Sequence, residues 1–322
     1  MLLRIGAARS PRRALLIGSL VAHSARGSAS ASASTFADFT LVEKRPTGSN
    51  GSQVLIFAAP DGSTLGGLDA STVPTSVYAA ASGLKKSYSP VSRADQIGTF
   101  ELLVRPYPPR EGGGLALALC NLGVGTTASL QVKPARKMHG SPGVVGRWSS
   151  LSLVAAGTGV APFVQILRHV LPDSPSTRVS LLFANRKAAD ILMREEIDAL
   201  AAAYGPQRLR VRYVISEHDD EAAADSGAAD GVCASELLVG RRIDLPMLRE
   251  FLPPPRPASQ AGAPSDCMVM VCGTDGFVEA LAGPTTREPP DPVTGKKGKK
   301  VQGPLTGHLA ELGYTAEEVY KF

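Results

Sequence analysis

One segment constrains the fold of this 322-residue chain more than any other: an apolar run that ends in glycine and passes directly into a helical pattern. The run SLSLVAAG (150–157) is typical of a buried strand, and APFVQILRHVL (161–171) has apolar residues at helical spacing. Further strand candidates lie at 178–185, 208–216 and 267–273, with helix candidates at 188–205 and 276–283. This alternation predicts parallel βαβ units in a doubly wound α/β sheet.

Two shorter segments stand between the third and fourth strand candidates. SELLVGR (235–241) and LPMLREFLP (245–253) are both expected to form short helices. The acidic stretch at 216–231 and the Pro-, Gly- and Lys-rich stretch at 282–304 are expected to be solvated loops. The second stretch carries four lysines that could contact an acidic partner: Lys296, Lys297, Lys299 and Lys300.

The first half of the chain has a different pattern. Between 36 and 146, brief and partly alternating apolar runs are separated by Gly, Pro, Asn, Asp or Ser, which predicts a small antiparallel barrel or sandwich. The pattern changes near Trp148. The sequence therefore predicts a leader at 1–34, an antiparallel β domain at 35–147 and an α/β domain at 148–322.

The leader contains five arginines, many serines and alanines, and no acidic residue. Such composition is typical of a mitochondrial transit peptide, although a secretory signal or an untargeted tail also fits it. Its apolar run ALLIGSLVA (14–22) is far shorter than the roughly 20 residues that a spanning helix needs. We expect no transmembrane span, while peripheral membrane association stays open.

Charge and cysteine usage exclude two classes of function. Without the five leader arginines, the 34 basic residues become 29, which equals the 29 acidic residues, so the charge total gives no case for nucleic-acid binding. The four cysteines are scattered, and no second Cys or His pair completes a zinc site beside Cys267 and Cys272. We therefore expect neither a disulfide framework nor a bound metal.

Two motifs point to ligand chemistry. Gly157-Thr158-Gly159 joins the first buried strand to a helix with Pro162 in its first turn, which exposes backbone N–H groups suited to a pyrophosphate. The second motif, KKSYSPVS (85–92), brings an aromatic ring, hydroxyls and lysines together. A surface turn explains it as well as a seat for a flat, phosphorylated ligand.

Five motifs follow one another along the chain: KSYSPVS, AAGTGVAPFVQILRHVL, LLFANRKAADILMREEID, VMVCGTDGF and the terminal GYTAEEVYKF. Their order and spacing resemble those of the ferredoxin–NADP reductase superfamily, and most closely its NADH–cytochrome b5 reductase branch. The resemblance implies a flavin-binding barrel followed by an NAD-binding domain. It also implies FAD as the cofactor, with FMN as the alternative, NADH as the donor, with NADPH as the alternative, and a haem protein as the acceptor.

In the barrel domain, the resemblance assigns flavin contacts to residues of three motifs. Tyr88 would pack on the flavin, Ser89 would bond near its reactive edge, and Ser92 would lie near its phosphates. Lys86 stands where the family has a phosphate-binding arginine, and a lysine lacks the bidentate fork. Ala116 stands where the family has a serine. The other implied contacts are Arg105, Tyr107, Gly112, Gly113 and Gly114.

In the α/β domain, Gly157, Thr158, Gly159 and Pro162 match the family's pyrophosphate loop. Asp190 would accept from the ribose hydroxyls of NADH, whereas Arg186 nearby favours NADPH. Cys272 and Gly273 would lie beside the nicotinamide, and Phe322 would approach the flavin. Ser89 and Cys272 are the implied catalytic residues.

A second function stays open from the sequence. Lys86, Ala116 and the absence of the family's prolines after Cys272 also suit a non-catalytic reductase-like module that docks partners and binds flavin weakly.

Overall fold

The structure is a computed structural model that describes residues 35–59, 69–81, 83–108, 114–217, 235–257, 259, 265–292, 298 and 300–322. The described residues all belong to one unit, residues 32–322. The predicted leader at 1–34 lies outside the described residues, as do Gly112, Gly113, Lys296, Lys297 and Lys299. Within the part of the chain that is described, no helix has both the length and the apolar character needed to cross a bilayer.

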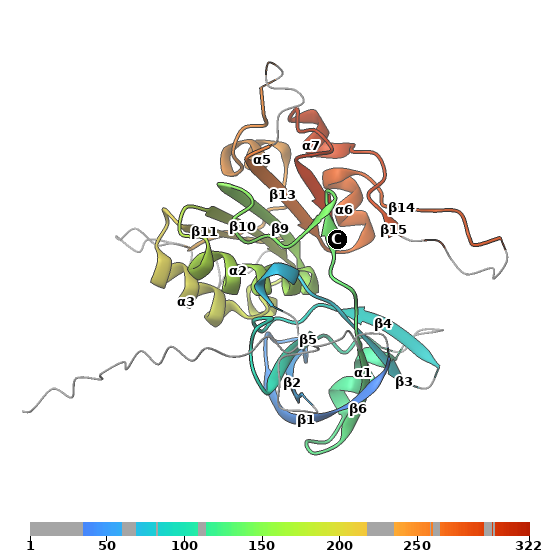
Figure 1. The fold of residues 1–322 in the computed structure, drawn as a ribbon. Helices are drawn as coiled ribbons and strands as arrows, with labels where there is room; N and C mark the ends of the chain where they lie inside the picture. The colour runs from blue at the N-terminus through green and yellow to red at the C-terminus, as the bar shows by residue number, and fades with distance from the viewer. Residues whose placement is uncertain are drawn as a thin grey trace, which may run out of the picture. The chain divides into compact units, whose positions relative to one another are not determined.

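The first half forms a curled antiparallel sheet (Figure 1). Its strands are β1 (Ala37–Pro46), β2 (Gln53–Ala58), β3 (Val77–Ala81), β4 (Leu84–Tyr88), β5 (Thr99–Val104) and β6 (Thr127–Val132), in the order β4-β3-β6-β1-β2-β5. A bridge between Pro90 and Leu102 ties the end of β4 to β5, so the two outer strands meet. Leu41, Phe57 and Phe100 fill the interior together with Leu115 of α1 (Leu115–Asn121). The barrel prediction is confirmed.

The second half contains a parallel sheet of six strands. They are β9 (Ser150–Ala156), β10 (Arg178–Asn185), β11 (Leu209–Ile215), β12 (Ser235–Val239), β13 (Cys267–Cys272) and β16 (Val319–Lys321). Their order is β12-β11-β10-β9-β13-β16, so the chain moves outward from β9 in one direction and later returns to its other side at β13. A ligand crevice is expected beyond the carboxyl ends of β9 and β13, where the winding direction reverses.

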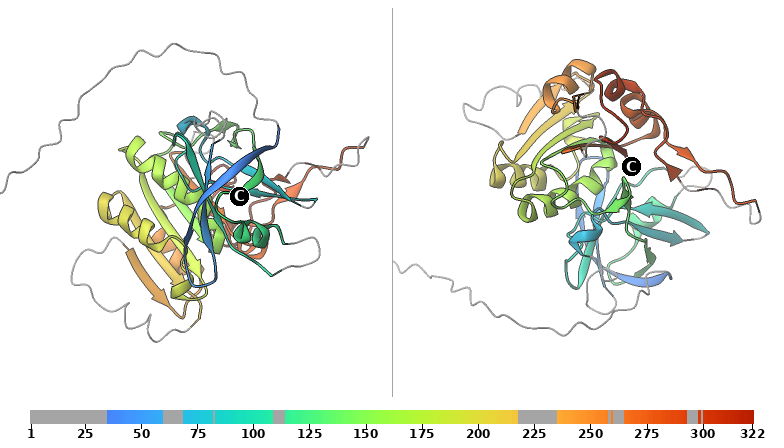
Figure 2. Two further views of the ribbon diagram at one scale, coloured as in Figure 1. Left: turned by 90° about the horizontal axis from the view of Figure 1, so that it is seen from below. Right: turned by 45° about the horizontal axis from the view of Figure 1, so that its top comes forward.

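Helices cover both faces of this sheet (Figures 1 and 2). On one face, α2 (Ala161–Asp173) and α3 (Arg194–Tyr204) share a core with Leu153 and Leu181. On the other, α5 (Leu245–Phe251), α6 (Asp275–Ala282) and α7 (Gly307–Glu311) share a core with Val154 and Leu182. Neighbouring residues of a strand point to opposite faces of the sheet, and helices cover both faces here. Each residue of such a strand is therefore buried, which explains the continuous apolar runs.

Short elements complete the fold. The 3₁₀ turns are Ala70–Thr72, Gly157–Val160 and Ala188–Asp190. Two small hairpins are formed by β7 (Lys137–Met138) with β8 (Ser141–Pro142), and by β14 (Thr286–Arg287) with β15 (Lys300–Val301).

Two element predictions were wrong in detail. The segment 235–241 is not helical, because 235–239 forms β12 and pairs in parallel with β11. The helix expected at 188–205 begins only at Arg194, after a 3₁₀ turn, because Met193 has a left-handed backbone with φ of 54°. In both places contacts with distant segments outweigh the local pattern. Met193, for example, donates its backbone N–H to Thr47 Oγ1 at 2.7 Å.

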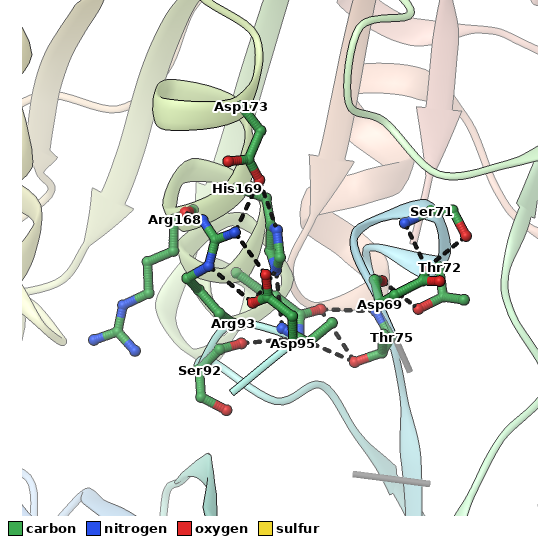
Figure 3. Close-up of polar contacts among 12 residues, drawn as sticks. Asp69, Ser71, Thr72, Thr75, Ser92, Arg93, Asp95, Arg168, His169 and Asp173 are labelled. Atoms are coloured by element: carbon green, nitrogen blue, oxygen red, sulfur yellow. Dashed lines mark hydrogen bonds and ion pairs between the residues drawn. The ribbon is translucent and has the colours of Figure 1, made fainter. Parts of the chain in front are cut away.

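The two sheets are joined through α2 by apolar and polar contacts. Val54 and Leu103 of the barrel lie in the same core as Phe163 and Ile166. Figure 3 shows the polar part. The Nη1 group of Arg93 donates to the carbonyl oxygen of Arg168 at 2.7 Å. The barrel therefore packs directly on the helix that follows the Gly157–Gly159 loop.

Candidate functional site

The Gly157–Gly159 loop lies against the end of β13. A Cβ atom built on Gly159 would be 2.3 Å from the carbonyl oxygen of Cys272, so no other residue fits there without displacing backbone. Gly157 has a φ of +52° and faces open space. Pro162 stands in the first turn of the 13-residue helix α2. The arrangement leaves backbone N–H groups at the crevice between β9 and β13, where a pyrophosphate can bind.

A cavity of about 620 Å³ opens at the carboxyl edge of the parallel sheet. Of the predicted nucleotide contacts, it is lined by Gly157, Thr158, Asp190 and Gly273. Arg105 and Tyr107, which follow β5 of the barrel, reach the same cavity. Near β9 and β13 its lining combines glycines and small side chains with Phe277 and Leu281, and near β10 to β12 it contains both polar and apolar side chains.

A second cavity of about 300 Å³ adjoins the first. Its lining includes Lys86, Tyr88 and Ser89 from the end of β4, and Ala116 from α1. From the α/β part of the chain it is lined by Gly159, Pro162, Cys272 and Gly273, among others. Arg105, Tyr107, Thr158 and Gly273 line both cavities, so the predicted flavin and nucleotide contacts meet at one place.

Tyr88 contributes a polar atom that has no partner. Its hydroxyl is buried and makes no hydrogen bond with any residue in the described ranges. Burial, followed by the charge of Cys120, raises the pKa of Tyr88 to about 12, so the phenol stays protonated and keeps its donor. A buried donor without a partner costs about 1–3 kcal/mol, which a ligand in the adjoining cavity could recover.

Cys272 ends β13 at the same place and is half-buried. Burial raises the pKa of its thiol to about 12, while Arg136 and Lys300 pull it the other way. The thiol is therefore protonated at neutral pH. It can present a soft, neutral S–H surface to a ligand but not a thiolate nucleophile.

Some of the predicted residues lie outside the lining of both cavities. Ser92 is fully buried, and its Oγ accepts the backbone N–H of Glu101 at 3.0 Å. Phe322 donates its N–H to Val271 at 3.0 Å, and its ring packs edge-on against Phe163 with centroids 5.5 Å apart. Gly114 precedes α1 with a φ of 107°.

Asp190 lines the larger cavity but is already engaged. Its Oδ1 accepts from the hydroxyl of Ser49 at 2.7 Å and from the amide of Asn50 at 3.3 Å. Both partners belong to the turn between β1 and β2. Asp190 therefore ties the barrel to the α/β part of the chain. If Asp190 also binds the ribose as predicted, the ribose hydroxyls must share its carboxylate with Ser49 and Asn50.

Sequence reasoning missed a polar group at the far end of the larger cavity. Asn185, Ser216, Arg241 and Arg242 line it, at or just beyond the carboxyl ends of β10, β11 and β12. Their places in the sequence could have identified them, because residues that directly follow parallel strands meet at one edge of the sheet. The misassigned helix at 235–241 hid that signal for the two arginines.

The residues present fit a flavin and a nicotinamide nucleotide. The smaller cavity offers an aromatic ring with an unpartnered hydroxyl, and a lysine at its rim. The larger cavity offers open glycine backbone at a helix start and a buried amide nitrogen without a partner, Nδ2 of Asn185. The chemistry of both donor sets suits anionic ligands with flat rings.

Two family models match the chain. A model described as an oxidoreductase FAD-binding domain matches residues 39–135, and one described as an oxidoreductase NAD-binding domain matches residues 153–282. The first match runs from within β1 to beyond β6 of the antiparallel sheet, and the second runs from within β9 to the end of α6, which leaves β16 of the parallel sheet outside it.

Individual relatives agree with these models. The chain is 30% identical over 270 residues to NADH-cytochrome b5 reductase 2 of Coccidioides immitis, covering 83% of this chain and 71% of that protein. It is 30% identical over 242 residues to NADH-cytochrome b5 reductase 2 of Saccharomyces cerevisiae, covering 75% and 67%. The solved cytochrome b5 reductase domain of Ulva prolifera nitrate reductase has the same fold, with a TM-score of 0.62, 21% identity and coverage of 89% and 97%.

Proposed function

The chain belongs to the NADH–cytochrome b5 reductase family of FAD-dependent oxidoreductases, and from this membership we propose that it delivers electrons from NADH to a haem protein. When bound, FAD takes up a hydride from NADH and releases electrons singly, which neither the protein nor the nucleotide can do alone. The observation that carries the proposal is the pair of adjoining cavities that share Arg105, Tyr107, Thr158 and Gly273.

The barrel residues hold and orient the flavin in this proposal. Tyr88 supplies a ring face and a buried hydroxyl donor, and Ser89 supplies a second hydroxyl to the lining of the smaller cavity. Lys86 is exposed and offers the flavin phosphates one point charge. Because a lysine makes no bidentate contact, we expect a weaker phosphate contact than an arginine would give.

The α/β residues position the nucleotide. The N–H groups at Gly157–Gly159 receive its pyrophosphate, and the close approach of Gly159 to β13 fixes this loop beside Cys272. The neutral thiol of Cys272 and the backbone at Gly273 would then form an uncharged wall for the nicotinamide. A nicotinamide held at this wall would lie beside the flavin seat, and holding donor and acceptor close is what direct hydride transfer requires.

Anaerobic titration of the purified protein with NADH tests the proposal. We expect yellow protein whose flavin absorbance bleaches with NADH and returns when oxidised cytochrome b5 is added. Protein that stays colourless after incubation with FAD or FMN would refute the enzyme reading and favour a docking module. Cytochrome c, free haem and a quinone, offered separately, compare the acceptors by their rates of flavin reoxidation.

We further propose that residues 1–34 direct the chain to mitochondria, on the strength of their arginine- and serine-rich, acid-free composition. Residues 1–40 fused to a fluorescent reporter should reach mitochondria, and a diffuse signal would contradict this. Alkaline extraction of the organelle fraction then tests peripheral membrane association, because a peripheral protein is released while a spanning one is retained.

A further inference from the structure

The turn between β1 and β2 reaches from the barrel to the segment that carries Asp190 in the wall of the larger cavity. The Oγ1 atom of Thr47 accepts the backbone N–H of Met193 at 2.7 Å. The backbone N–H of Ser49 donates to the carbonyl oxygen of Ala189 at 2.7 Å. The turn is therefore fixed on both sides of Asp190 without the help of that carboxylate.

The side chain of Asn50 has a fixed orientation within this turn. Its Oδ1 atom accepts the backbone N–H of Ser52 at 3.2 Å and also the hydroxyl of that buried serine. Because the amide oxygen is used in this way, the amide presents its nitrogen to Asp190. The Nδ2 group of Asn50 donates to Oδ1 of Asp190 at 3.3 Å. The amide is therefore oriented towards Asp190 before any ligand binds.

Two donors meet the same oxygen of Asp190. The hydroxyl of Ser49 donates to Oδ1 at 2.7 Å, beside the amide of Asn50. The other oxygen, Oδ2, accepts no hydrogen bond from the part of the chain that the structure describes, and the side chain lines the larger cavity. Two donors on one oxygen restrict rotation of the carboxylate, so its second oxygen keeps one position and can accept from a ligand.

The same end of the barrel contributes to the larger cavity a second time. Because β2 pairs with β5, the turn that precedes β2 adjoins the residues that follow β5. A Cβ atom built on Gly51 would be 3.4 Å from Cγ of Pro106. Arg105 and Tyr107, on either side of this proline, line the cavity. The barrel is therefore part of the wall that a nucleotide would meet.

Fastening the barrel to the α/β part does not account for the two side-chain donors. The backbone contacts of the turn already fasten it, whereas Ser49 is exposed and Asp190 is only half-buried. A hydrogen bond at such a place adds little to stability, because water would replace it. Two donors that converge on one oxygen at a cavity wall are better explained by the binding of a ligand at the other oxygen.

We propose that Ser49 and Asn50 are positioning residues of the nucleotide site, which hold Asp190 so that its Oδ2 atom accepts from the hydroxyls of the adenosine ribose. The inference rests on the nucleotide site of the proposed function. Neither residue touches the nucleotide, and each acts through the carboxylate of Asp190. Residues of the flavin-binding barrel thereby help to set the affinity of the α/β part for its nucleotide.

Two nucleotides isolate the ribose hydroxyls. Both 5′-AMP and 2′,3′-dideoxy-5′-AMP carry adenine and a 5′-phosphate, and only the first carries ribose hydroxyls. In calorimetric titrations of the full chain, we expect 5′-AMP to bind roughly tenfold more tightly, because hydrogen bonds to a charged carboxylate are lost in the dideoxy nucleotide.

Ser49→Ala tests the positioning role. We expect it to lower the affinity for 5′-AMP roughly threefold and to leave that for the dideoxy nucleotide unchanged. In an Asp190→Ala background the same substitution should have no further effect, because Ser49 acts only through Asp190. Ser141→Ala is the matched control, because Ser141 is an exposed serine of β8 that lines neither cavity.

Asn50→Asp provides a second variant. It keeps an oxygen for Ser52 but replaces the donor to Asp190 by an acceptor, so it should also reduce the preference for 5′-AMP over the dideoxy nucleotide. In both variants the KM for NADH should rise while kcat stays unchanged, because the lost contact is made equally before and during hydride transfer.

The outcomes separate this inference from the proposed function. Equal affinity of the wild type for the two nucleotides would overturn the positioning role and leave the nucleotide site intact. An equal loss of both affinities in Ser49→Ala, or a loss that persists in the Asp190→Ala background, would overturn it too. Binding of neither nucleotide to the wild type would overturn the nucleotide site together with the positioning role.

Discussion

The Nε2 atom of His169 accepts a hydrogen bond from the backbone N–H of Ala94 at 2.8 Å. The imidazole is therefore neutral and carries its proton on Nδ1, which lies 3.2 Å from Asp173 Oδ2 (Figure 3). His169 is fully buried in α2, and Ala94 belongs to the segment between β4 and β5. One histidine thus connects the barrel to the α/β part through an acceptor that exists only while the ring is uncharged.

Stability should fall in mild acid because of this histidine. Burial, followed by the charge of Arg93, lowers the pKa of His169 below its usual 6.5, although Asp173 and Asp95 oppose the shift. As the pH falls through about 6.5, His169 takes up a proton in the unfolded chain before it does so in the folded chain. The contribution of the neutral imidazole to the free energy of unfolding is therefore complete above about pH 6.5 and is lost as the pH falls further.

Urea unfolding at pH 7.5 and pH 5.5 measures this loss. His169→Gln, which keeps an acceptor but does not titrate, should lose less stability between the two pH values than the wild type. Burial also lowers the pKa of His139, but its contribution cancels in this comparison because His139 is present in both proteins. If the free energy of unfolding falls equally in the wild type and the variant between these pH values, His169 is not the cause of the acid sensitivity.

Gln165→Leu should destabilise the fold strongly. The side chain of Gln165 is fully buried, accepts the backbone N–H of Thr75 at 2.7 Å, and donates to the carbonyl of Ser92 at 3.0 Å. Leucine would leave both backbone groups buried without partners, at about 1–3 kcal/mol each. Denaturant melts should show a drop of this order, whereas the exposed Gln207→Leu should change stability little.

Gly159→Ala should damage the nucleotide loop more than it damages the rest of the fold. The added methyl would meet the backbone of Cys272 and Gly273 at 2.3–2.8 Å, so the loop or β13 must move. We expect affinity for 5′-AMP to fall by roughly tenfold or more, in line with the 1.4 kcal/mol that such a change represents. Gly123→Ala is the control, because a Cβ there meets only Thr126 Cγ2 at an ordinary 3.6 Å and Gly123 lines neither nucleotide cavity; similar losses in both variants would contradict the proposed packing role.

Tyr88→Phe should separate cofactor binding from folding. Removing a buried hydroxyl without a partner should leave the free protein as stable as before, or slightly more stable. If that hydroxyl donates to the flavin, the dissociation constant for FAD, measured by fluorescence titration, should rise about tenfold. An unchanged dissociation constant would show that the hydroxyl does not touch the flavin.

The sequence predicts the site where a residue's role follows from its place on a strand end. Gly157, Thr158, Gly159 and Gly273 lie together because their strands are adjacent, and strand order follows from the βαβ pattern. Contacts between the barrel and α2 cannot be predicted in this way, because no local sequence pattern indicates which residues meet. Nothing in the pattern around Asp190 indicates that Ser49 and Asn50, some 140 positions earlier, occupy its carboxylate.

The core shared by Val54, Leu103, Phe163 and Ile166 has a consequence for folding. A fragment that starts at Ser150 would expose the apolar side of α2 to water, at roughly 25 cal/mol for each Å² uncovered. Neither sheet is then an independently stable module, and calorimetry of residues 35–322 should show a single cooperative transition. Joining either half to a foreign partner would therefore require the surface between the barrel and α2 to be rebuilt.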